Sequence, residues 1–252
     1  MIERSHWFFS HQLPVEQRFA SFSLPHLYYI IAGIVVVIVL SIIIKRLSRE
    51  QAMRFIRVGA IGLLAFYFIR SYLFYLLLPN YTYLDIVPLH LCVISGFVIP
   101  LAVFSRNKLL LNISYAILMP GAMMAIITPD RPLTLYHPFG WMPLVYFLWH
   151  FWVVALPVLL VVSGELVPDI RKYPLSILSL CGYATFVYLF NTKMNTNYLF
   201  INRPARGTLL EPLNEIFGNP GYLIPLALIT FTVILLMFIP WWIKAKKAKV
   251  QL

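Results

Sequence analysis

Long apolar stretches, each about as long as a membrane-spanning helix, dominate the pattern of hydrophobic and polar positions. A hydrocarbon core of about 30 Å requires about 20 predominantly apolar residues from each helix. Seven stretches meet this requirement, and they cover approximately residues 26–44, 58–78, 84–104, 109–128, 139–162, 174–190 and 222–243. The pattern therefore predicts an all-α fold, a polytopic membrane helix bundle with seven transmembrane helices.

The remaining segments are consistent with a single transmembrane helical domain that covers residues 1–252. Residues 1–25 lack a long apolar core, and the run His6-Trp7-Phe8-Phe9 is typical of an interfacial N-terminal segment rather than a cleavable signal peptide. Residues 191–221 form the longest connection, and we expect an outer loop there. Residues 244–252 predict a basic cytoplasmic tail.

Composition excludes an ordinary soluble domain. Hydrophobic residues make up 61% of the chain and charged residues only 12%, whereas an average soluble domain is about 25% charged. The net charge is +11, but the basic residues flank apolar stretches. We therefore expect contact with membrane phospholipids and no nucleic-acid partner. The expected location is the plasma (cell) membrane, as a multi-pass protein.

The distribution of lysine and arginine predicts the orientation, because cytoplasmic segments carry an excess of these residues. With the N-terminus outside, 13 basic residues lie on the inner side and 6 on the outer side. The inner set is Lys45, Arg46, Arg49, Arg54, Arg57, Arg106, Lys108, Arg171, Lys172, Lys244, Lys246, Lys247 and Lys249. The outer set is Arg4, Arg18, Arg131, Lys193, Arg203 and Arg206. The excess predicts an outer N-terminus and an inner C-terminus.

The third stretch begins with a polar run from Asp85 to Cys92. Ionisable residues inside a bilayer are costly and are functional candidates. Asp85 and Cys92 share one stripe of an ideal helix. His90 is two residues from Cys92, about 200° around an ideal helix, so we expect it to face elsewhere unless Pro88 or Pro100 distorts the backbone.

His150, on the fifth stretch, is a better candidate partner for the thiol. Cys92 lies about 12 Å inside the outer boundary of the third stretch, at about 1.5 Å per residue. By the same count, His150 lies about 16 Å inside the fifth stretch and Arg70 about 12 Å below the outer end of the second. These three residues are therefore expected at similar depth in the outer half of the bilayer.

The residue types suit acyl transfer. An imidazole that accepts a thiol proton produces a thiolate nucleophile, so Cys92 and His150 are the candidate catalytic pair. An arginine holds a phosphate or carboxylate as a planar fork. The candidate substrate-binding residues are Arg70, Asp85, Asn191, Asn197 and Tyr198. Neither Cys92 nor Cys181 has metal-ligand spacing, and we expect no cofactor.

Each candidate also has a purely structural interpretation. A cysteine in a helical bundle is usually a small core residue. His150 could bond a neighbouring helix. Arg70 could form an ion pair with Asp85, or extend to the interface.

Four short motifs occur in order along the chain. They are Val87-Pro88-Leu89-His90-Leu91-Cys92, Ile127-Thr128-Pro129-Asp130, Phe147-Leu148-Trp149-His150 and Asn197-Tyr198-Leu199-Phe200. As an ordered set that covers most of the chain, they resemble the bacterial YwaF-like (TIGR-type) integral membrane proteins. These proteins group with a eukaryotic transmembrane family that remodels ether phospholipids by acyl transfer. The resemblance implies a cysteine acyl-enzyme with an assisting histidine, at Cys92 and His150.

Two function hypotheses follow. The first is a phospholipid or lysophospholipid acyltransferase that works through an acyl thioester in the outer half of the bilayer. The second is a non-enzymatic membrane protein that binds or transports a lipid or solute. Transport would require discontinuous helices near the midplane, for which Pro120-Gly121 is the candidate position.

Overall fold

The computed structural model describes residues 8–9, 13–78, 81–129, 131–205, 208 and 210–250, and every regular element within them is helical. The predicted all-α fold is therefore confirmed. His6 and Trp7 of the predicted interfacial run lie outside the described residues, as do Asp130 and the last two residues of the basic tail.

Six helical segments in the described part of the chain are long and apolar enough to cross a membrane. They are α1 (Leu24–Arg46), α2 (Arg49–Leu77), Lys108–Ile127, α7 (Trp141–Val162), α8 (Tyr173–Met194) and α10 (Leu223–Val250). The segment Lys108–Ile127 comprises α5 (Lys108–Ile113), a π-helical turn (Ser114–Leu118) and α6 (Met119–Ile127). The π turn widens the helix just before Pro120, whose ring would clash with a carbonyl one α-turn earlier. Pro120 therefore does not interrupt this segment.

The third predicted stretch is divided. A single turn, α3 (Tyr83–Ile86), is followed by an unwound segment and then by α4 (Leu91–Ser105). Pro88 explains the break, because proline lacks a backbone N–H and disfavours helical geometry in the residue before it. Val87 accordingly has a ψ of 123°. The 15 residues of α4 rise only about 22 Å, so the seven-span count and the orientation stay predictions.

α2 begins nine residues before the predicted boundary, at Arg49. Ser48 forms a capping box in which its hydroxyl accepts from the Gln51 backbone N–H (3.3 Å) and the Gln51 side chain accepts from the Ser48 N–H (3.0 Å). These bonds satisfy the first free N–H groups of a helix. The basic residues of this region therefore lie on a helix rather than in a loop.

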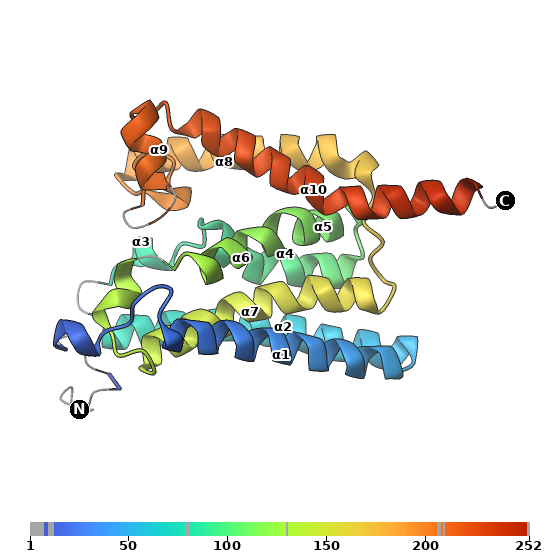
Figure 1. The fold of residues 1–252 in the computed structure, drawn as a ribbon, viewed down its shortest axis with the longest axis horizontal. Coiled ribbons are helices and arrows are strands. Elements are labelled where there is room, and N and C mark those ends of the chain that lie inside the picture. The colour runs from blue at the N-terminus through green and yellow to red at the C-terminus, as the bar shows by residue number, and fades with distance from the viewer. Residues whose placement is uncertain are drawn as a thin grey trace.

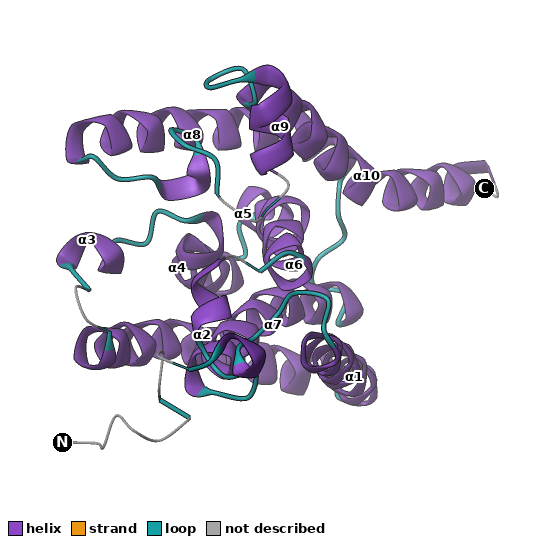
Figure 2. Ribbon diagram, turned by 60° about the vertical axis from the view of Figure 1, so that its left-hand side comes forward, coloured by secondary structure: helices purple, strands orange, loops and turns teal. Residues whose placement is uncertain are grey.

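The helices are arranged in three tiers (Figures 1 and 2). α8 and α10 lie along one side, α4, α5 and α6 lie in the middle, and α1, α2 and α7 lie along the other side. Two glycines allow close packing of tryptophans of α7. An added Cβ at Gly96 would lie 2.7 Å from the ring of Trp149, and one at Gly62 would lie 2.7 Å from the ring of Trp152. The described ends of the chain lie at opposite ends of the bundle in Figure 1.

The surface of α1 supports membrane insertion. Ile31, Ile34, Val35 and Ile38 each expose between 50% and 52% of their surface. Large apolar patches are rare on soluble monomers, and here they run along a 23-residue helix. This surface is suited to contact with lipid tails.

The predicted outer loop 191–221 contains helical turns of its own. These are η5 (Tyr198–Phe200) and the short helix α9 (Leu210–Phe217). α9 lies at the end of the bundle opposite the C-terminus (Figure 1), and η5 reaches α3 through the hydrogen bond from the Tyr198 hydroxyl to the Leu84 carbonyl.

Candidate functional site

Side chains from four other elements donate hydrogen bonds to backbone carbonyls of the interrupted third stretch. Tyr198 donates its hydroxyl to the Leu84 carbonyl, Tyr67 donates to Ile86 O (2.5 Å), and Tyr183 donates to Leu89 O (2.9 Å). Trp149 donates its indole N–H to Cys92 O (3.0 Å). A carbonyl freed from a helix inside a bilayer needs such a partner. The four bonds therefore fix the backbone around Cys92.

The Arg70 side chain of α2 packs against three aromatic rings. Its Cζ lies 4.5 Å from the ring centroid of Trp149 and 5.6 Å from those of Tyr67 and Phe74. Its Nε is fully buried and has no hydrogen-bond partner in the described ranges. Cation–π stacking compensates part of the desolvation cost but leaves the guanidinium donors available for an anion.

Cys92 is the second residue of α4 and is half-buried. Trp149 links it to Arg70, since one indole both bonds the Cys92 carbonyl and stacks with the guanidinium. Trp149, which the sequence pattern does not single out, therefore connects the Arg70 side chain with the Cys92 backbone.

His150 is 4% exposed on α7, and its ring centroid lies 4.1 Å from that of Tyr146. Its Nδ1 lies 2.7 Å from the Tyr146 carbonyl oxygen. Because a carbonyl only accepts, this geometry assigns the proton of a neutral ring to Nδ1 and leaves Nε2 as the proton acceptor. Arg70 also acts electrostatically on His150.

His90 lies outside the regular part of α4, so the ideal-helix geometry behind its predicted direction does not apply. His90 caps α4 from outside the helix, with φ −70° and ψ 142°. Its ring centroid lies 5.2 Å from Tyr198 and 5.0 Å from Phe200, and the charge of Arg70 acts on it. His90 therefore joins the Arg70 environment. Pro88 was the feature of the sequence that could have indicated this.

Asp85 does not pair with Arg70 in the part of the chain that the structure describes. One carboxylate oxygen instead accepts from the backbone N–H and the hydroxyl of Thr82, both at 2.7 Å. Asp85 thereby caps α3. Its predicted role in substrate binding stays a prediction.

The predicted asparagines organise the outer loop. The Asn191 amide donates to Tyr198 O (2.9 Å) and accepts from the Tyr198 N–H (2.9 Å). Asn197 donates to Arg203 O (2.9 Å) and accepts from Arg203 N–H (3.0 Å). Burial raises the pKa of Tyr198 to about 12, so its hydroxyl stays protonated as a donor to Leu84. Direct substrate contact by these three residues stays a prediction.

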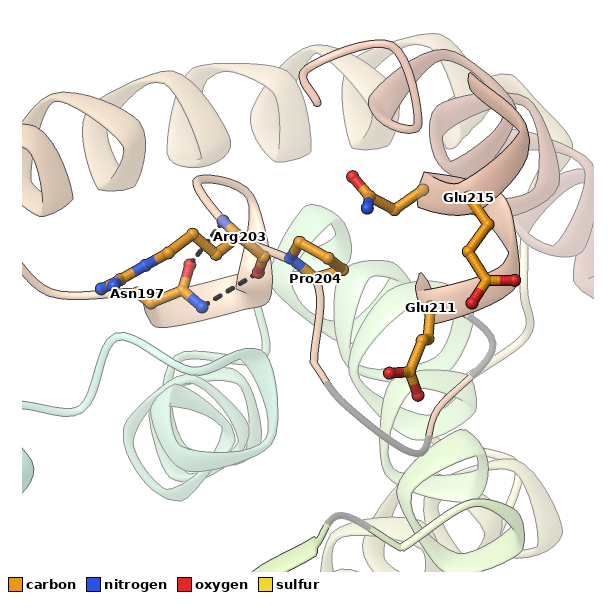
Figure 3. A pocket seen from close by; sticks show the side chains of 6 residues that line it. Asn197, Arg203, Pro204, Glu211 and Glu215 are labelled. Carbon is orange, nitrogen blue, oxygen red and sulfur yellow. Dashed lines mark hydrogen bonds between the residues drawn. The ribbon is translucent and has the colours of Figure 1, made fainter. Parts of the chain in front are cut away.

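A pocket of about 540 Å³ lies within the segment 191–221. It is lined by Asn197, Arg203, Pro204, Glu211, Asn214 and Glu215. Figure 3 shows the paired bonds between Asn197 and Arg203 on one side, with Glu211 and Glu215 on α9 across from them. In Figure 3 the Arg203 guanidinium points away from Glu211 and Glu215.

Comparison with known proteins identifies one family. The model of the TMEM164 family matches residues 21–239, which include α1 to α9 and most of α10. No curated protein and no solved structure matches the chain.

Proposed function

The chain belongs to the TMEM164 family, a family of transmembrane proteins, and on this premise we propose that it transfers fatty-acyl chains between membrane phospholipids. The proposed site is the environment of Cys92, His150 and Arg70. The plasma membrane is the proposed location.

One observation carries the proposal: Trp149 stacks with the Arg70 guanidinium and bonds the Cys92 carbonyl. An arginine that can bind an anion and the backbone of Cys92 thereby contact the same indole. A phospholipid offers a phosphate and an ester carbonyl on adjoining glycerol carbons. Arg70 binds the phosphate, which brings an ester toward sulfur.

The reaction has two half-steps. His150 Nε2 accepts the thiol proton, and the Cys92 sulfur attacks the ester carbonyl carbon. The bond from that carbon to the glycerol oxygen breaks, and the oxygen takes the proton from His150. The hydroxyl of an acceptor lysophospholipid then attacks the thioester and gives its proton to His150. The bond from the acyl carbon to sulfur breaks, the new phospholipid leaves, and the sulfur takes the proton back from His150.

The outer loop supports the site indirectly. Asn191 and Asn197 hold the loop through paired backbone bonds, and Tyr198 fixes it to α3. Asp85 fixes the start of α3. In this proposal the loop covers the headgroup and limits the access of water to the thioester.

The test uses purified protein in lipid nanodiscs with a labelled phospholipid and an unlabelled lysophospholipid. Cys92→Ala should abolish acyl transfer and the fatty-acyl adduct that mass spectrometry detects on the peptide containing Cys92. Cys181→Ala is the matched control, because Cys181 is exposed on α8 and should retain both. Undiminished transfer by Cys92→Ala, or no transfer by the wild type, would reject the proposal.

The unwound segment between α3 and α4 favours a second candidate, a non-enzymatic binding or transport protein. Transporters place substrates at discontinuous helices. This candidate predicts uptake or retention of a lipid or solute that is equal in Cys92→Ala and wild-type protein. A thioester adduct on Cys92 would exclude it.

A further inference from the structure

A second cavity lies at the end of the bundle that carries the C-terminus. It has a volume of about 310 Å³ and is lined by Arg49, Glu50, Met53, Arg57, Arg106 and Glu165. These residues come from the first turns of α2, the residue after α4 and the segment after α7. Figure 1 shows that the three segments meet at the same end of the bundle, opposite the outer loop.

The cavity carries an excess of positive charge. Arg49 donates from Nε to a carboxylate oxygen of Glu165 at 2.5 Å. That hydrogen bond, followed by the charges of Arg49, Arg106 and Arg57, holds the pKa of Glu165 below its usual range against an opposing effect of burial. Three guanidinium groups and two carboxylates line the cavity, which leaves one positive charge without a counterion among its lining residues.

Arg57 is the group with an unmet hydrogen-bond requirement. Its Nε is fully buried and has no partner among the residues that the structure describes. A buried charged donor without an acceptor is costly. Arg106 faces the same cavity from a fixed backbone position, because it ends α4 in the left-handed conformation with φ 54°.

We propose that this cavity binds the phosphate group of an anionic phospholipid at the inner face of the membrane. A phosphodiester carries one negative charge, which equals the excess in the cavity. Its oxygens accept from the fork of Arg57 and from Arg106. Basic pockets between helices on the cytoplasmic side suit such headgroups, and the volume is at the lower end of the range for ligand sites. The proposal is independent of acyl transfer at Cys92.

The test measures the thermal stability of the full chain in neutral detergent during titration with three probes. These are dioctanoylphosphatidylglycerol, dioctanoylphosphatidylcholine and inorganic phosphate. A ligand that binds only the folded state raises Tm in a concentration-dependent way. Phosphatidylglycerol should raise the Tm of the wild type at lower concentration than phosphatidylcholine does. A rise with inorganic phosphate of equal size would assign the site to free phosphate instead of lipid.

Arg57→Gln and Arg54→Gln are the matched variants. Both remove one positive charge from the same helix, but Arg54 is exposed and does not line the cavity. Arg57→Gln should weaken the apparent affinity for phosphatidylglycerol about tenfold or more, whereas Arg54→Gln should leave it within about twofold.

Arg106→Asn is a second variant in case Arg57→Gln fails to fold. Asparagine tolerates the left-handed conformation, so this change removes the charge without altering the backbone requirement. It should also weaken binding, by severalfold. Equal loss in Arg54→Gln and the cavity variants, or no anion-dependent rise in the wild type, would overturn the proposal.

Discussion

At the scale of single residues, the aromatic rings around Arg70 determine which side chain can stand at this position. The guanidinium is planar and stacks with Trp149, whereas the ammonium of lysine is compact and more strongly hydrated. The position therefore requires arginine rather than positive charge alone.

Arg70→Lys should consequently raise the KM for the phospholipid donor roughly tenfold, since a desolvated cation–π contact and a bidentate phosphate contact are both lost. Acyl-transfer kinetics in nanodiscs measure this effect. Arg54→Lys, at an exposed position of the same helix, is the control and should leave the KM unchanged.

At the same scale, the absence of a side chain at Gly96 leaves room for the ring of Trp149. A Cβ there would lie 2.7 Å from Trp149, which is 1% exposed and cannot move freely. Gly96→Ala should therefore destabilise the protein by about 1–3 kcal/mol.

Gly182→Ala is the control for this prediction, because nothing lies within 4 Å of an added Cβ on α8. Alanine is the better helix former by about 1 kcal/mol, so this variant should be neutral or slightly stabilised. Thermal unfolding in detergent measures both changes. Equal Tm shifts in the two variants would contradict the packing argument.

At the scale of elements, the break between α3 and α4 depends on donors from other helices. Tyr183 of α8 bonds the Leu89 carbonyl inside the unwound segment. Tyr183→Phe should leave this carbonyl unpaired and cost about 1–3 kcal/mol. Hydrogen exchange should then increase in residues 87–93. Tyr188→Phe, exposed on the same helix, should change neither quantity.

The ion pair between Arg49 and Glu165 connects the start of α2 with the segment after α7. Arg49 holds the pKa of Glu165 below its ordinary value. Such a group contributes stability above its unfolded pKa of about 4.3, and the contribution is lost as the pH falls through the lower folded pKa. Acidification should therefore reduce Tm more in the wild type than in Glu165→Gln.

Tm measured between pH 7 and pH 3 checks this expectation. Glu16→Gln, at an exposed residue of the turn η1 (Val15–Gln17), is the control and should follow the wild-type curve. Identical curves for Glu165→Gln and the wild type would show that the ion pair contributes nothing.

At the scale of the whole molecule, the described ends of the chain lie at opposite ends of the bundle (Figure 1). The excess of basic residues at the C-terminal end predicts that this end is cytoplasmic. In intact cells, an impermeant maleimide should therefore label Thr208→Cys, in the outer loop. It should label Lys246→Cys only after permeabilisation. The reverse labelling pattern would show the opposite orientation. The site around Cys92 would then lie on the cytoplasmic side, and the arginine-lined cavity would lie on the outer side.

The candidate site shows how far sequence reasoning reaches. Depth along three stretches predicts that Arg70, Cys92 and His150 lie at one level, and their mutual proximity stays a prediction. The expected alternative partner of Arg70, Asp85, instead caps α3. His90 precedes the first residue of α4 with an extended backbone, so an ideal helical angle does not describe its direction relative to Cys92.

The sequence by itself determined the helical class, the membrane environment and the approximate spans, because apolar length and charge distribution are local properties of the chain. Only the tertiary structure decided which donors hold the break at Pro88, and that Trp149 joins Arg70 to Cys92. It alone also placed Arg57, Arg106 and Glu165 around one cavity. These arrangements depend on the packing of helices far apart in sequence, and periodicity along a single helix does not specify which faces meet.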